Sequence, residues 1–105
     1  MNQQHRHGDV GLFPVAELPD ECRLVPRDGG DVVLAYGEVT GHAHRIASRR
    51  VALWSQGDRR YLVVEEPAEL THEEHGAQTL APGVYEVVQQ REYDYLAEMS
   101  RAVAD

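Results

Sequence analysis

The stretch DVVLAYGEVTGHAHRI, residues 31–46, is the longest strand-like segment of the chain, and the rest of the fold is interpreted from it. Its even positions read Val32, Leu34, Tyr36, Glu38, Thr40, His42, His44 and Ile46. Alternate residues of a strand point to the same face of a sheet. An unbroken strand would therefore place His42 and His44 on the apolar face, whereas a bulge or turn at Gly37 or Gly41 would reset the register.

Shorter strand-like runs on both sides of this stretch predict a mainly β domain. Residues 51–54 and 61–64 flank a polar segment that contains a glycine, which is typical of a hairpin. Further strands are expected at residues 10–15, 68–70 and 84–91.

The C-terminal residues predict a helix. Asp94 is a suitable N-cap for a helix over residues 95–104. Its apolar residues recur at spacings of three and four, at Leu96, Met99 and Val103. We expect a single small β-barrel or β-roll over residues 9–105 that ends in this short helix, and a polar mobile tail at residues 1–8.

Composition narrows the class of protein. A chain of 105 residues buries a modest core, so a bound metal or a partner subunit would help to stabilise it. The net charge of −8 argues against nucleic-acid binding, since an acidic surface repels phosphates. A single cysteine, Cys22, fits a reducing compartment, and no run approaches the roughly 18 apolar residues of a membrane span. We expect a cytoplasmic protein that does not bind membranes.

Four of the six histidines form two close pairs, His42 with His44 and His72 with His75. Histidine is the commonest protein ligand for divalent transition metals, and a site needs three or four donors from different segments. Two histidines that are two residues apart on a strand lean the same way. The pairs therefore predict one metal site, for zinc in the first place and for nickel, iron or copper as alternatives.

The second pair lies in a segment with helix-end signals. Thr71 and Glu74 have the spacing of a capping box, and Gly76 is a suitable helix stop. One helical turn would place His72 and His75 on the same side. His5 and His7 repeat the spacing of the first pair, but they lie in the expected tail, so we expect them to be solvated.

Three carboxylates adjoin the histidine pairs in sequence: Glu38, Glu73 and Glu74. Each can serve as a ligand, as the partner of an imidazole N–H, or as a general base. We take Glu74 and Glu38 as candidate catalytic residues and interpret Glu73 as a solvated surface charge.

The motif Gly37-Glu38-Val39-Thr40-Gly41-His42-Ala43-His44 resembles a family of short, functionally uncharacterised bacterial and phage proteins. The same resemblance continues in Gly8-Asp9-Val10, in His72-Glu73-Glu74-His75, and in Pro82-Gly83-Val84-Tyr85 through Gln90-Arg91-Glu92-Tyr93. It covers nearly the whole chain and implies no particular reaction.

A weaker similarity is to cupins, which are small β-barrels with a glycine followed by His-x-His and a later Pro-x-Gly element. Gly37, His42 and His44 fit this pattern loosely. No glutamate follows His44 within several residues, and His75 precedes the Pro82-Gly83 turn instead of following it. The similarity therefore implies only a β-barrel that holds a metal.

Two functions remain open at this level. With three of the four histidines as ligands, a metal would keep an open position for water and could support hydrolysis, whereas four ligands would make the site structural. The alternative is a non-catalytic, self-assembling structural or phage-related accessory protein. An apolar stripe on the expected terminal helix predicts a homo-oligomer contact: Tyr93, Leu96, Met99 and Val103.

Overall fold

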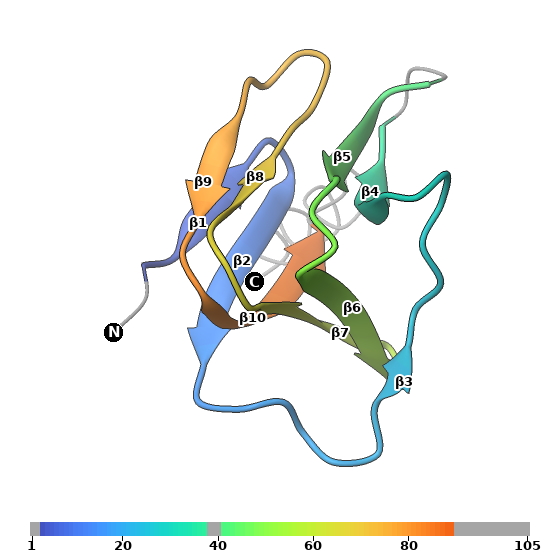
Figure 1. Ribbon diagram of the computed structural model, residues 1–105, viewed down its shortest axis with the longest axis vertical. Coiled ribbons are helices and arrows are strands. Elements are labelled where there is room, and N and C mark those ends of the chain that lie inside the picture. Colours follow the sequence, from blue (N-terminus) through green and yellow to red (C-terminus); the bar gives the residue numbers. More distant parts are fainter. Residues whose placement is uncertain (1–2, 38–40, 90–105) are drawn as a thin grey trace, which may run out of the picture.

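The computed structural model describes residues 3–37 and 41–89, and in this part the chain forms β-strands and no helix (Figure 1). The strands are β1 (His5–His7), β2 (Val10–Val15), β3 (Arg23–Leu24), β4 (Val32–Tyr36), β5 (Ala43–Ile46), β6 (Val51–Gln56), β7 (Arg59–Val64), β8 (Ala68–Leu70), β9 (Gln78–Leu80) and β10 (Gly83–Gln89). The expected mainly β fold is confirmed. In these two ranges, no helix is present that is long and apolar enough to cross a membrane.

Six strands form one antiparallel sheet in the order β1-β2-β10-β7-β6-β3. The predicted hairpin is confirmed as β6 and β7, which pair in register from Val51 opposite Val64 to Gln56 opposite Arg59. Strand β10 lies between β2 and β7, so the second and last described strands are neighbours in the middle of the sheet.

Two further hairpins, β4–β5 and β8–β9, stand side by side at the upper end of the molecule in Figure 1. A single bridge joins them, in which Arg45 and Thr71 exchange backbone hydrogen bonds of 2.9 Å. Across the gap from β9 to β1, the Gln78 side chain donates to the Arg6 carbonyl oxygen at 2.6 Å.

The described strands do not close into a barrel. The outer strands of the six-stranded sheet, β1 and β3, do not pair with each other, and the two hairpins belong to sheets of their own. The fold is therefore an open arrangement in which side chains, and not a continuous ladder, connect β9 to β1.

The long stretch at residues 31–46 folds as a hairpin and not as one strand. Gly41 has φ +88°, which favours glycine, and the Gly37 N–H donates to the His42 carbonyl oxygen at 2.8 Å. The chain therefore reverses between β4 and β5, so the register expected for an unbroken strand does not apply. His44 nevertheless points inward, because β5 itself alternates and buries Ile46 on the same side.

The core lies between the large sheet and the two hairpins. Its largest fully buried side chains are Tyr85, Leu12, Leu34, Ile46, Leu62, Leu70 and Leu80. The Tyr85 hydroxyl donates to the Ala81 carbonyl oxygen at 2.7 Å, so the one polar atom of this large buried ring has a partner.

The expected mobile tail at residues 1–8 is wrong for residues 5–7, which form the edge strand β1 against β2. The prediction that His7 is solvated is also wrong, since its side chain is 1% exposed. His5 is half-buried, with its ring edge-on to Tyr85. A polar composition suggested a tail, but pairing with β2 satisfies the backbone and hides every second side chain.

Several predictions fall on residues outside the described part. These are Glu38, the helix over residues 95–104, and the stripe of Tyr93, Leu96, Met99 and Val103. Homo-oligomerisation, and with it the accessory-protein alternative, therefore stays a prediction.

Candidate metal centre

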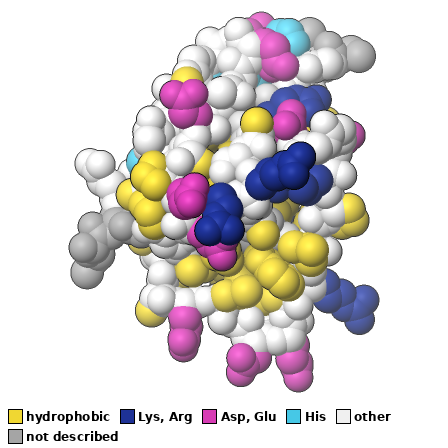
Figure 2. Space-filling model, viewed as in Figure 1, with side chains coloured by type: hydrophobic (Ala, Val, Ile, Leu, Met, Phe, Trp, Pro, Cys, Tyr) yellow, Lys and Arg dark blue, Asp and Glu magenta, His cyan; other side chains and the backbone are white. Residues whose placement is uncertain are grey.

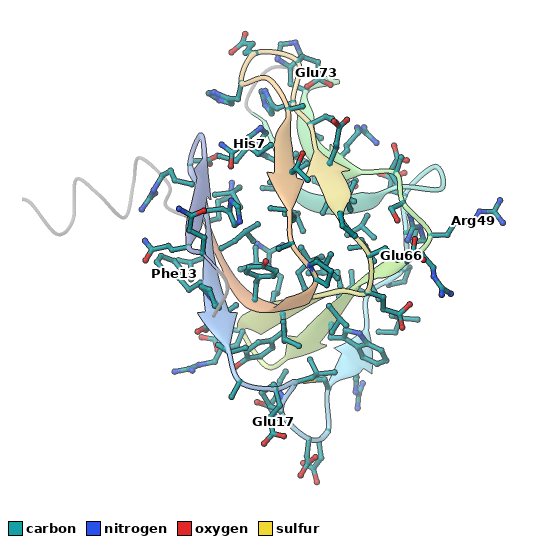
Figure 3. The ribbon with its side chains drawn as sticks, turned by 60° about the vertical axis from the view of Figure 1, so that its left-hand side comes forward. His7, Phe13, Glu17, Arg49, Glu66 and Glu73 are labelled. Carbon is teal, nitrogen blue, oxygen red and sulfur yellow. The ribbon has the colours of Figure 1, made fainter. Side chains whose placement is uncertain are left out.

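Five histidines from three segments meet at one end of the molecule, near the labelled His7 and Glu73 in Figure 3. His7 ends β1, His42 immediately precedes β5, His44 lies in β5, and His72 and His75 lie in the loop between β8 and β9. Histidine and acidic side chains are visible together at this end in Figure 2.

His72 lies at the centre of this cluster. Its ring centroid is 4.5 Å from that of His44, 4.5 Å from that of His75, 5.7 Å from that of His42 and 6.3 Å from that of His7. The structure thus brings together the four histidines that the sequence singled out and adds His7 to them. The repeated His-x-His spacing at residues 5–7 was the signal for that fifth member.

The loop that carries His72 and His75 is a tight turn and not a turn of helix. The Thr71 hydroxyl donates to the Arg45 carbonyl oxygen at 3.3 Å, so it does not cap a helix. Instead, the Glu74 N–H donates to Nδ1 of His72 at 3.0 Å. The capping-box prediction is therefore wrong, although the turn still places His72 beside His75.

Three potential ligand atoms converge at this turn. One donor atom each from His42, His72 and Glu73 lie within 4.8 Å of one another. Metal–ligand bonds of about 2.0–2.2 Å require donors roughly 3–3.5 Å apart, so the site would be completed by side-chain movements that close these distances and release Nδ1 of His72 from the Glu74 N–H. Glu73, which sequence reasoning treated as a surface charge, is the carboxylate in this group.

Glu73 is held as an anion. Its own backbone N–H and then the Ala43 N–H, which donates to Oε2 at 3.0 Å, lower the pKa of the Glu73 carboxyl. Glu74 lies outside the group of three, with Oε1 3.7 Å from Nδ1 of His42. At that distance the Glu74 carboxylate lies beside the His42 imidazole without a hydrogen bond to it.

His44 is engaged at both ring nitrogens. Its Nδ1 lies 2.8 Å from Nδ1 of His7, and its Nε2 lies 3.1 Å from Oδ1 of Asp9. The side chain is 2% exposed. His44 therefore contacts the ring of His72 from inside the fold, while its nitrogens are occupied by other partners.

Burial and crowding lower the pKa of two of these imidazoles. For His44 the largest cause is burial, followed by the neighbouring His72 and His7, while Asp9 acts in the opposite direction. For His72 the causes are burial and then His75. Both side chains therefore favour the neutral form, which is the form that binds metal.

The metal-free protein should lose stability as the pH falls below the ordinary histidine pKa of 6.5. Because His44 and His72 have lower pKa values in the folded state, the unfolded chain binds more protons in this range, and the free energy of unfolding falls with decreasing pH. Urea unfolding at a series of pH values from about 7.5 to about 5 measures this slope. A double variant with asparagine at both positions should show a flatter profile, and an equal slope in the variant would contradict the assignment.

The chain matches a family model described as a domain of unknown function (DUF8820) over residues 6–90. The matched range contains all five clustered histidines and the nearby carboxylates Asp9, Glu73 and Glu74. No curated protein and no solved structure matches the chain.

Proposed function

This chain belongs to the DUF8820 family, and we propose that it is a small metal-binding β protein that holds one divalent transition metal in its histidine cluster. The observation that carries the proposal is the convergence of His42, His72 and Glu73, from two loops that are thirty residues apart in sequence. Of the four predicted ligands, His42 and His72 belong to this group. His44 and His75 contact the ring of His72, each with a centroid distance of 4.5 Å.

The donor chemistry supports a transition metal. Two neutral imidazoles and one carboxylate form a ligand set found in catalytic zinc sites, and also in sites for non-haem iron. Zinc is our first choice, with iron, nickel and copper as alternatives. The ionised state of Glu73 and the neutral state of His72 both favour binding, since a metal binds the deprotonated form of each group.

Three protein ligands would leave a coordination position open. A metal with such a position can lower the pKa of a bound water and so support hydrolysis. Glu74 lies beside His42 and is 63% exposed, so it can orient that imidazole or accept a proton from the solvent side. A metal-dependent hydrolase is therefore the activity that we propose to test first.

The test is metal content. After chelation and titration with Zn²⁺, the full chain should bind about one equivalent, as measured by calorimetry and elemental analysis. His72→Ala should abolish stoichiometric binding, because His72 contacts every other histidine of the cluster. Binding should also raise the stability of the native state, by roughly 2.7 kcal/mol at a free metal concentration of about a hundred times Kd.

His5→Ala is the matched control, because His5 contacts Tyr85 and lies apart from the cluster. This variant should bind Zn²⁺ as the unchanged chain does. Metal binding that survives His72→Ala, or that disappears with His5→Ala, would show that the metal binds elsewhere.

A further inference from the structure

His7 is buried at the edge of the sheet and bonded at both ring nitrogens. Its Nε2 lies 2.6 Å from the Gly76 carbonyl oxygen, and its Nδ1 lies 2.8 Å from Nδ1 of His44. A carbonyl oxygen only accepts hydrogen bonds, so Nε2 of His7 carries the hydrogen. The Asp9 carboxylate likewise only accepts, so Nε2 of His44 also carries a hydrogen, and one hydrogen lies between the two Nδ1 atoms.

The hydrogen bond from His7 to Gly76 holds one end of the turn that carries the proposed ligands His72 and Glu73. The turn starts at Thr71, which is fixed by its backbone bridge to Arg45 of β5. It ends at Gly76, whose carbonyl oxygen is held by His7 of β1. The turn with His72 and Glu73 is thus anchored at its two ends by different strands.

His7 also contacts His44, the buried histidine of the cluster. His7 and Asp9 together occupy both nitrogens of His44, which fixes the orientation of that ring. The His44 ring in turn lies 4.5 Å from the ring of His72. His7 therefore restricts the position of the His72 imidazole in two ways, through the turn that carries it and through the ring of His44.

We infer that His7 is the positioning residue of the proposed metal site, which holds the turn of residues 72–76 and His44 in the arrangement that lets His42, His72 and Glu73 meet. The expected effect on metal affinity rests on the proposed function, whereas the effect on the turn does not. An apolar side chain at this position would leave the Gly76 carbonyl oxygen without its donor. A glutamine could restore that bond, because its Nε2 also donates.

The experiment compares His7→Ala with His7→Gln in the full chain and uses His5→Gln as the control on the same strand. Hydrogen exchange of the metal-free protein, followed by NMR, reports the Ala43 and Glu74 amides, which bond to the side chains of Glu73 and His72. Titration with Co²⁺ reports affinity, and the visible Co²⁺ spectrum reports the geometry of the ligands.

His7→Ala should accelerate exchange at both amides, weaken Co²⁺ binding about 10- to 100-fold and alter the Co²⁺ spectrum, which is the effect expected for a residue that orients ligands. His7→Gln should recover the protection of the turn and most of the affinity. His5→Gln should behave as the unchanged chain does.

Unchanged exchange and affinity in His7→Ala would overturn the inference, and so would equal losses in the alanine and glutamine variants. Protection of the β6–β7 amides shows whether each variant is folded. If His7→Ala unfolds, recovery in His7→Gln supports the inference and unfolding of both overturns it. If the unchanged chain binds no Co²⁺, the proposed function fails, while exchange in the metal-free variants still decides whether His7 holds the turn.

Discussion

Glu73→Gln is expected to weaken Zn²⁺ binding by about a hundredfold or more, at or beyond the upper end of the losses seen for outer-shell partners. The amide is neutral and a poorer ligand for a divalent cation than the carboxylate that lies with His42 and His72. Its oxygen can still accept the Ala43 N–H, so the turn should keep its shape. Calorimetric titration of the purified variant measures the change in affinity.

Glu74→Gln is the matched control, since it makes the same change one residue further along the same turn. Glu74 is more exposed, and its carboxylate is 3.7 Å from His42 and outside the converging group. We expect a loss of about tenfold or less, at the low end of the range for outer-shell partners. The opposite ranking, with the larger loss at Glu74, would restore the sequence-based choice of Glu74 over Glu73.

Gly8→Ala should be the most damaging single-methyl change near the cluster. A Cβ at Gly8 would lie 2.7 Å from Nε2 of His75 and 3.1 Å from Cε1 of His44, and the backbone has φ +61°. The left-handed conformation costs about 1–2 kcal/mol, and the crowding adds roughly 1–3 kcal/mol. We expect the sum to be lost from the free energy of unfolding, of which small domains have only about 5–15 kcal/mol.

Gly57→Ala separates the backbone cost of Gly8→Ala from the cost of crowding. Gly57 also has φ +61°, but a Cβ there would meet nothing within 4 Å. Urea unfolding of Gly57→Ala should therefore show only the backbone cost, about 1–2 kcal/mol. If Gly8→Ala is no worse than Gly57→Ala, and binds Zn²⁺ equally well, then His75 and His44 are not packed against the backbone of Gly8.

Local patterns in the sequence were sufficient for β2, β6, β7, β8 and β10 and for two of the three converging ligands, whereas β1, β3 and β9 were not predicted. Alternating apolar residues and a short polar connection identified the β6–β7 hairpin, because pairing of neighbouring strands depends on residues that are close in the chain. The two histidine pairs were recognisable for the same reason, and the structure brings them together.

Only the tertiary structure decided which polar segment became an edge strand and which carboxylate joined the histidines. A polar segment at residues 5–7 became a strand because β2 was available to pair with it, and that pairing buried His7. Glu73 and Glu74 are equivalent in sequence, yet only Glu73 meets the Ala43 N–H, from a segment thirty residues away. The open edge between β1 and β9 likewise depends on long-range packing, so local residue patterns predict most of the strands, and contacts between distant segments determine how the site is assembled.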